Sequence, residues 1–139
     1  MVTLGPVAET LRVLIVEDRP IMLKILRKLL TSSGVKDVDE ALNGREALDH
    51  LAGRTYDLIL SDWNMDELSG FELLKAVRGD PRTATTPFIL ITAEAKPDNI
   101  LAAQRAGVDD YLLKPFGADA LMQAIGRALA RQRGEMAAA

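Results

Sequence analysis

Residues 56–66 have the sequence YDLILSDWNMD, and this stretch governs how the rest of the chain is interpreted. Its apolar run, 58–60, is typical of a strand that is buried on both faces. The apolar character ends at Asp62, and the turn-prone residue Asn64 follows. A carboxylate at the end of a buried parallel strand lies at the carboxyl edge of the sheet, where open α/β folds bind ligands. Taken alone, Asp62 is more simply explained as the residue that ends a strand, so its role depends on the other strands.

Four further segments have the composition of strands, and a helical pattern follows each of the five. The predicted strands cover 11–16, 35–41, 57–62, 88–92 and 111–113, and the second is more polar and therefore nearer a sheet edge. The expected helices begin near residues 20, 43, 70, 97 and 118, and the last ends near 131. In the first helix, apolar residues recur at helical spacing at Met22, Ile25, Leu26 and Leu29. This α/β alternation predicts a doubly wound, five-stranded parallel sheet with five helices and right-handed crossovers.

The length of 139 residues fits a single domain. We expect it to cover residues 11–131, between a flexible N-terminal lead-in at 1–10 and a flexible C-terminal tail at 132–139. The net charge of −3 argues against a broad nucleic-acid-binding surface, and the lack of cysteine excludes disulfides and thiolate metal sites. Neither a signal peptide nor an apolar run of about 18 residues is recognised. The expectation is a cytoplasmic monomer with no nucleic-acid and no membrane partner.

Side chains that suit one reaction stand at the ends of four predicted strands. Glu17 and Asp18 follow the first strand, and Asp62, Thr92 and Lys114 end the third, fourth and fifth. In a parallel sheet these ends share one edge, where three carboxylates would repel one another unless a cation lay between them. Mg²⁺ fits, because proteins hold it with carboxylates and water. A hydroxyl and an ammonium beside a metal and a carboxylate suit phosphoryl transfer, in which the carboxylate can be the nucleophile.

Each of these residues also has an ordinary structural explanation. Glu17 or Asp18 could cap the following helix. Thr92 could simply end a strand, and Lys114 could be a loop cation. Their occurrence together, each at the end of its own strand, favours a common site.

In this order, the segments Glu17-Asp18, Asp62, Thr92-Ala93 and Lys114-Pro115-Phe116 resemble the motif set of the receiver domain of two-component response regulators. The resemblance covers about residues 11–131, and the motif set is highly specific. Within the family it is strongest to the stand-alone regulators of chemotaxis, on the stretches 61–65, 92–96 and 111–116. It implies the flavodoxin-like (βα)5 version of the doubly wound fold.

The resemblance implies a role for each site residue. Asp62 would accept a phosphoryl group from a phosphohistidine, on a sensor histidine kinase or a histidine phosphotransfer protein. Asp18, Asp62 and the backbone carbonyl of Asn64 would bind Mg²⁺, and Glu17 would do so directly or through water. The protein would be a phosphoacceptor in signalling rather than an enzyme, although it would assist its own phosphorylation and dephosphorylation.

The resemblance also implies how the signal would be passed on. Lys114 and Thr92 would contact the phosphoryl oxygens, and the peptide between Lys114 and Pro115 would be cis. Tyr111 would be the aromatic switch, turning inward as Thr92 is drawn to the phosphoryl group. The surface of the fourth helix, fifth strand and fifth helix would then change its affinity for a partner, such as the flagellar motor switch.

The sequence departs from the family pattern beside the site. Glu17 stands where Asp is more usual, and Asp66 stands where a Pro usually follows the Met. The neighbouring acids Asp66 and Glu67 could strengthen metal attraction or slow the acquisition of an anionic phosphoryl group. Arg19 could approach the mouth of the site, but a solvated residue at the start of a helix is the simpler explanation.

Other functions fit the sequence less well. A phosphatase of the haloacid dehalogenase type needs a general acid two residues after its nucleophile, and Asn64 cannot fill that role. Neither a dinucleotide-binding glycine motif nor a Walker loop is present. Within the receiver class, the alternatives to a chemotaxis regulator are a phosphorelay intermediate, a phosphate sink, or the receiver fragment of a larger transcriptional regulator. The chemotaxis interpretation is favoured by Trp63, Asn64, Glu94 and Tyr111.

Overall fold

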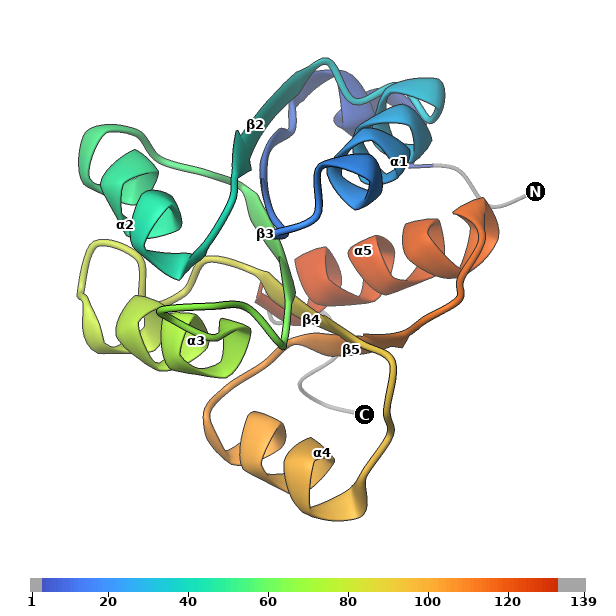
Figure 1. The fold of residues 1–139 in the computed structure, drawn as a ribbon. Helices are drawn as coiled ribbons and strands as arrows, with labels where there is room; N and C mark the ends of the chain where they lie inside the picture. The colour runs from blue at the N-terminus through green and yellow to red at the C-terminus, as the bar shows by residue number, and fades with distance from the viewer. Residues whose placement is uncertain (1–3, 133–139) are drawn as a thin grey trace.

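The computed structural model describes residues 4–132 and contains a five-stranded parallel sheet (Figure 1). The strand order is β2-β1-β3-β4-β5, which is the predicted doubly wound arrangement. The strands are β1 (Arg12–Val16), β2 (Asp37–Ala41), β3 (Leu58–Asp62), β4 (Phe88–Thr92) and β5 (Asp110–Leu113). Because every neighbouring pair is parallel, all five carboxyl ends lie at one edge of the sheet.

Helices cover both faces of the sheet. In the described part of the chain they are α1 (Pro20–Ser32), α2 (Gly44–Gly53), α3 (Gly70–Gly79), α4 (Pro97–Arg105), α5 (Ala118–Gln132) and the short 3-10 helix η1 (Gly5–Thr10). α1 and α5 pack on one face, and α2, α3 and α4 pack on the other, so the core forms two clusters with the sheet between them (Figure 1). None of these described helices is long and apolar enough to cross a membrane.

The central strands β3 and β4 are buried on both faces, which explains their uninterrupted apolar sequences. Along β3, Leu58 and Leu60 face the cluster beneath α1 and α5, whereas Ile59 faces the opposite cluster. This double burial ends at Asp62, the last residue of the strand. The carboxylate is therefore held at the edge of a rigid strand.

The outer strands are more polar than the central ones, as the sequence predicts for the second strand. β2 buries only two of its five residues and carries the acids Asp37, Asp39 and Glu40. β5, at the other side of the sheet, begins with Asp110. Both strands that lack a second neighbour in the sheet thus carry acidic side chains.

The buried face of α1 differs from the apolar stripe that was recognised in the sequence. That stripe is Met22, Ile25, Leu26 and Leu29, whereas the buried residues are Leu23, Leu26 and Leu30. The side chain of Ile25 is 46% exposed. Met22 and Leu29 are partly buried and pack against the same core cluster, so only Ile25 of the recognised stripe is exposed.

Local signals at the helix ends agree with the sequence. The Asn43 side chain accepts a backbone N–H in the first turn of α2. Ser69 and Glu72 form a reciprocal capping box at the start of α3. Pro20 and Pro97 stand in the first turns of α1 and α4, where a missing N–H costs nothing.

The N-terminal lead-in contains more structure than the flexible segment that the sequence predicts. η1 buries Ala8, which is 1% exposed and belongs to the core cluster beneath α1. The backbone N–H of Leu11 donates to the carbonyl of Ala8 at 3.3 Å and joins η1 to β1. The predicted tail at 132–139 lies outside the described residues, except for Gln132, which ends α5.

Candidate functional site

Three carboxylates converge at the carboxyl ends of β1 and β3. Ligand atoms of Glu17, Asp18 and Asp62 all lie within 4.8 Å of one another. The register explains this, because Val16 of β1 pairs with Ser61 of β3 and the next residues are acidic on both strands. Glu17 and Asp62 are buried, and Asp18 is exposed. The structure therefore brings together the three acids that the sequence places at this edge.

Lys114 supplies a cation to the carboxylates from the end of β5. Its Nζ lies 2.7 Å from Oδ1 of Asp62 and 3.5 Å from Oε2 of Glu17. The side chain is only 14% exposed. Its backbone N–H donates to the carbonyl of Thr92 at 2.8 Å, and the Lys114–Pro115 peptide is cis, as predicted. The ammonium is thus fixed against the carboxylate that the sequence singles out.

Thr92 and Tyr111 lie beside this group on β4 and β5. Thr92 is buried, and its Oγ1 accepts the backbone N–H of Glu94 at 3.3 Å. The half-buried Tyr111 donates its hydroxyl to the carbonyl of Glu94 at 3.0 Å, and burial raises the pKa of this phenol. Its ring meets Trp63 edge-on, with centroids 6.2 Å apart. The predicted switch pair is therefore connected through the segment that follows β4.

Asn64 lies at the open side of the site. It lines a shallow cavity of about 270 Å³ together with Asp18, Trp63, Met65, Asp66 and Ser69. The exposed acid Asp66 thus faces the same cavity as Asp18.

Glu17 is held by a residue that the sequence analysis did not favour as part of the site. Arg19 Nε lies 3.0 Å from Oε1 of Glu17, and the backbone N–H of Arg19 donates to the same oxygen at 3.3 Å. Burial raises the pKa of Glu17, its hydrogen bond to Arg19 opposes that shift, and the nearby charge of Asp62 adds to it. The only sequence signal was the position of an arginine directly after the acidic pair, for which a solvated helix start was the simpler explanation.

Gly70 is a second residue that the sequence analysis did not assign to the site. A Cβ at this position would lie 2.1 Å from the carbonyl oxygen of Asp62, which is a backbone atom. The Gly70 N–H also donates to the carbonyl of Trp63 at 2.9 Å. The start of α3 therefore packs directly against the backbone of Asp62, and only glycine permits this approach. A glycine at a helix start was visible in the sequence, but its contact was not.

The donor set fits a hard divalent cation such as Mg²⁺. Its ligand atoms are carboxylate oxygens, which Mg²⁺ prefers, and two of the three acids are buried. Lys114 and Arg19 are the cations that contact these acids, so the group of three carboxylates keeps one formal negative charge. A bound cation would relieve the remaining repulsion.

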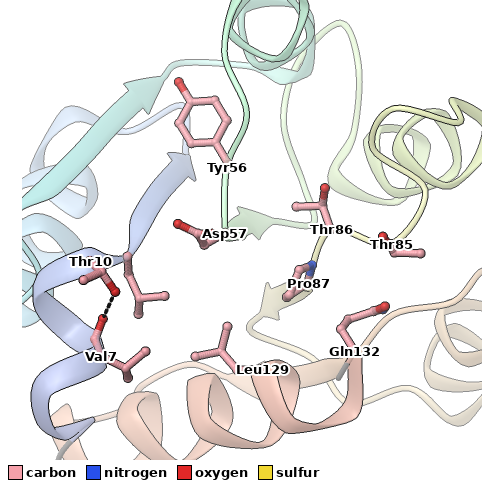
Figure 2. Close-up of a pocket in the computed structure, with 10 residues that line it drawn as sticks. Val7, Thr10, Tyr56, Asp57, Thr85, Thr86, Pro87, Leu129 and Gln132 are labelled. Carbon is pink, nitrogen blue, oxygen red and sulfur yellow. Dashed lines mark hydrogen bonds between the residues drawn. The ribbon is translucent and has the colours of Figure 1, made fainter. Parts of the chain in front are cut away.

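A larger pocket lies at the opposite, amino edge of the sheet (Figure 2). It encloses about 390 Å³ and is lined by residues that precede β1, β3 and β4 and by the end of α5, among them Thr10, Asp57, Thr86 and Leu129. None of the predicted site residues lines it. The chemistry of the side chains, rather than cavity size, therefore identifies the candidate site.

Known proteins share this arrangement of elements. A solved structure of the chemotaxis protein CheY4 of Vibrio cholerae superposes with a TM-score of 0.81 at 33% identity, covering 86% of this chain and 98% of that chain. The receiver domain of a sensor histidine kinase of Pseudomonas aeruginosa, solved with a magnesium ion coordinated in its active-site cleft, gives 0.78 at 28% identity. This likeness covers 86% of this chain and 98% of that chain.

Sequence comparison gives the same result. The chemotaxis protein CheY of Pseudomonas aeruginosa is 40% identical over 124 residues, which is 89% of this chain and 100% of that protein. The family model of the response regulator receiver domain matches residues 13–126, from the start of β1 into α5. The chain belongs to the response regulator receiver domain family.

Proposed function

We propose that this chain accepts a phosphoryl group on Asp62 in an Mg²⁺-dependent reaction and signals by a phosphorylation-switched change in protein binding. The donor would be a phosphohistidine of a sensor histidine kinase or of a histidine phosphotransfer protein. The observation that carries the proposal is the place of Asp62, which ends a buried strand 2.7 Å from Lys114 and within a group of three carboxylates.

In the transfer, a carboxylate oxygen of Asp62 attacks the phosphorus of the phosphohistidine. A new P–O bond forms, the P–N bond breaks, and the departing imidazole takes up a proton. The Lys114 ammonium, already paired with Asp62, is near enough to pair with a phosphoryl oxygen. The Thr92 hydroxyl can donate to another oxygen once it turns from the N–H of Glu94. Hydrolysis of the acyl phosphate by water would restore the carboxylate and end the signal.

Asp18, Asp62 and the backbone carbonyl of Asn64 would hold Mg²⁺, with Glu17 acting directly or through water. The bound ion would neutralise charge between these carboxylates and the incoming phosphoryl group. The convergence of the three acids within 4.8 Å supports this part of the proposal.

The switch would act through Tyr111. Phosphorylation replaces a carboxylate of charge −1 by a group of charge near −2 with new acceptor oxygens. As Thr92 donates to one of them, the space it leaves becomes available to the Tyr111 ring, whose hydroxyl now holds the carbonyl of Glu94. The surface formed by α4, β5 and α5 would change its shape and its affinity for a partner. This is a shift between two populated states.

The proposed pathway is chemotaxis, with the flagellar motor switch as the downstream target. The support is the likeness to chemotaxis proteins, at 40% identity to one that the chain covers from end to end. A phosphorelay intermediate or phosphate sink is the second candidate, because similar solved structures include the receiver domain of a sensor histidine kinase.

The proposal is tested by adding Mg²⁺ and then acetyl phosphate, while the fluorescence of Trp63 is recorded. We expect the fluorescence to change on each addition. The phosphodonor step, and the mass increase of one phosphoryl group that accompanies it, should require Mg²⁺. The phosphodonor step should be lost in Asp62→Ala. Unchanged mass and fluorescence in the wild type would refute the phosphoacceptor function.

The two candidate roles predict different partners for the phosphorylated chain. A chemotaxis regulator should bind a flagellar motor switch protein more tightly after phosphorylation. A relay or sink protein should instead exchange its phosphoryl group with a histidine phosphotransfer protein, without such binding.

A further inference from the structure

One oxygen of Glu17 is occupied by Arg19 before any ligand binds. Arg19 is the residue before α1, and both its Nε and its backbone N–H point at Oε1 of Glu17, at 3.0 and 3.3 Å. The second oxygen, Oε2, lies 3.5 Å from Lys114. The Glu17 side chain is 1% exposed, so almost no water reaches it. The two cations are therefore its main source of charge compensation.

We propose that Arg19 is a tethered competitor of the divalent cation, and that its guanidinium lowers the affinity of the site for Mg²⁺. The inference rests on the proposed Mg²⁺ site and deepens it. Arg19 is thus a positioning residue that acts on the metal through Glu17.

The charges at the site explain the direction of the effect. A guanidinium that stays on Glu17 repels a divalent ion placed among the three carboxylates, and it uses a lone pair that the ion or its bound water would use. The charges of Glu17, Asp62 and Asp18 all stabilise protonated Arg19. Arg19 is therefore attracted by the same charges that would attract the metal.

The exposure of Arg19 allows it to leave. Its side chain is 56% exposed, in contrast to 14% for Lys114. The guanidinium can be hydrated once it swings into solvent, so the cost of its departure lies mainly with the buried Glu17, which an incoming cation or its bound water would then compensate. Lys114 stays beside Asp62, while Arg19 is the cation that can give way.

The test compares Mg²⁺ binding by wild type and Arg19→Gln, starting from metal-free protein. Binding is followed by Trp63 fluorescence and by titration calorimetry. We expect roughly two- to fivefold tighter binding in Arg19→Gln, the size typical of the loss of one partly exposed charge interaction. The matched control is Lys28→Gln, which removes the same charge from an exposed position on α1 and should change the affinity less than twofold.

A second readout uses thermal unfolding. Without metal, Arg19→Gln should unfold at a lower temperature than wild type, because the buried Glu17 loses a partner. Saturating Mg²⁺ should then raise the unfolding temperature more in the variant than in wild type.

Two results separate this inference from the proposed function. Equal or weaker Mg²⁺ binding by Arg19→Gln, in a wild type that does bind, would overturn the competitor role and leave the metal site intact. Lack of binding by both proteins would overturn the Mg²⁺ site, and the inference with it.

Discussion

Two buried aspartates at opposite edges of the sheet have opposite surroundings. Asp109, just before β5, is 8% exposed and accepts hydrogen bonds from Phe88 N–H and Arg78 at 2.8 Å and from Gln132 at 2.6 Å. Asp62, at the end of β3, is 7% exposed, but its group includes two further carboxylates. The two residues are therefore buried to a similar degree, but Asp109 is saturated with hydrogen-bond donors whereas the group around Asp62 has an excess of acceptor oxygens.

This difference separates a structural carboxylate from a reactive one. Asp109 connects α3, β4 and α5 by accepting hydrogen bonds from all three, and no further ligand is needed to compensate its charge. The carboxylates around Asp62 repel one another and keep oxygen atoms available, which is the condition for binding a cation or accepting a phosphoryl group. The exposure of the whole residue, 8% for Asp109 and 7% for Asp62, does not distinguish the two.

The largest expected effect comes from alanine at the two positions. Asp109→Ala should lower the free energy of unfolding by about 3–5 kcal/mol, because Arg78 remains buried without its carboxylate. Asp62→Ala should change it by less than about 1 kcal/mol, since the lost pair with Lys114 is offset by relief of repulsion. Urea unfolding of metal-free protein measures both. Similar losses at the two positions would break the comparison.

A second test concerns the backbone beneath Asp62. Gly70→Ala should cost about 1–3 kcal/mol, because its Cβ would lie 2.1 Å from a carbonyl oxygen that cannot move freely. It should also slow phosphorylation, since the shift displaces Asp62. Gly126→Ala on α5 is the control: nothing lies within 4 Å of its Cβ, so a gain of about 0.5–1 kcal/mol is expected. Stability equal to wild type in Gly70→Ala would refute the close approach.

Asp39 of β2 is another carboxylate surrounded by donors, and it predicts a pH dependence. The Asp39 carboxylate accepts hydrogen bonds from Tyr56 and Arg54, which hold its pKa below the ordinary value of 3.8. A lowered folded-state pKa gives stability that is present above the unfolded pKa and lost as the pH falls through the folded one. Asp39→Asn should therefore cost about 1 kcal/mol at pH 7. This difference from wild type should close as the pH falls below 3.8, in acid unfolding curves. A constant difference would show that ionisation is not its source.

The smallest expected effect lies in the loop after Asp62. Glu67 has φ of +67°, which is unfavourable for a residue with a Cβ. Asn tolerates this conformation better, so Glu67→Asn should raise the free energy of unfolding by about 0.5 kcal/mol. Asp66→Asn is the control, because it removes the same charge at a position where φ is not positive. An equal gain in both variants would indicate relief of charge repulsion rather than of backbone strain.

Much of the fold and of the site could be predicted because both depend on where strands end. The apolar run before Asp62 and the one before Thr92 stop abruptly, and the parallel arrangement then brings their ends to one edge. The cap at Asn43 is a local signal and was equally visible. These features need only short segments of sequence and one rule of topology.

The remainder depends on contacts that short patterns do not encode. The partners of Asp109 are 21 to 31 residues away in the chain. The path of the loop that brings Gly70 against Asp62 is a tertiary feature. In α1, only the packing against the sheet shows that Leu23 and Leu30 are buried whereas Ile25 is exposed. The contact of Arg19 with Glu17 depends on the orientation of one long side chain.

The acidic outer strands have a consequence for self-association. A sheet with open sides can recruit a strand from another molecule, and this is how many β-rich proteins aggregate. A copy approaching along β2 would meet the partly exposed ion pairs that Asp37, Asp39 and Glu40 form with Arg12, Arg54 and Arg27, and burying these charges would oppose the contact. Along β5, burying the ion pair between Asp110 and Arg127 would oppose the same event. The charged groups at its two sides thus favour a sheet that stops at five strands.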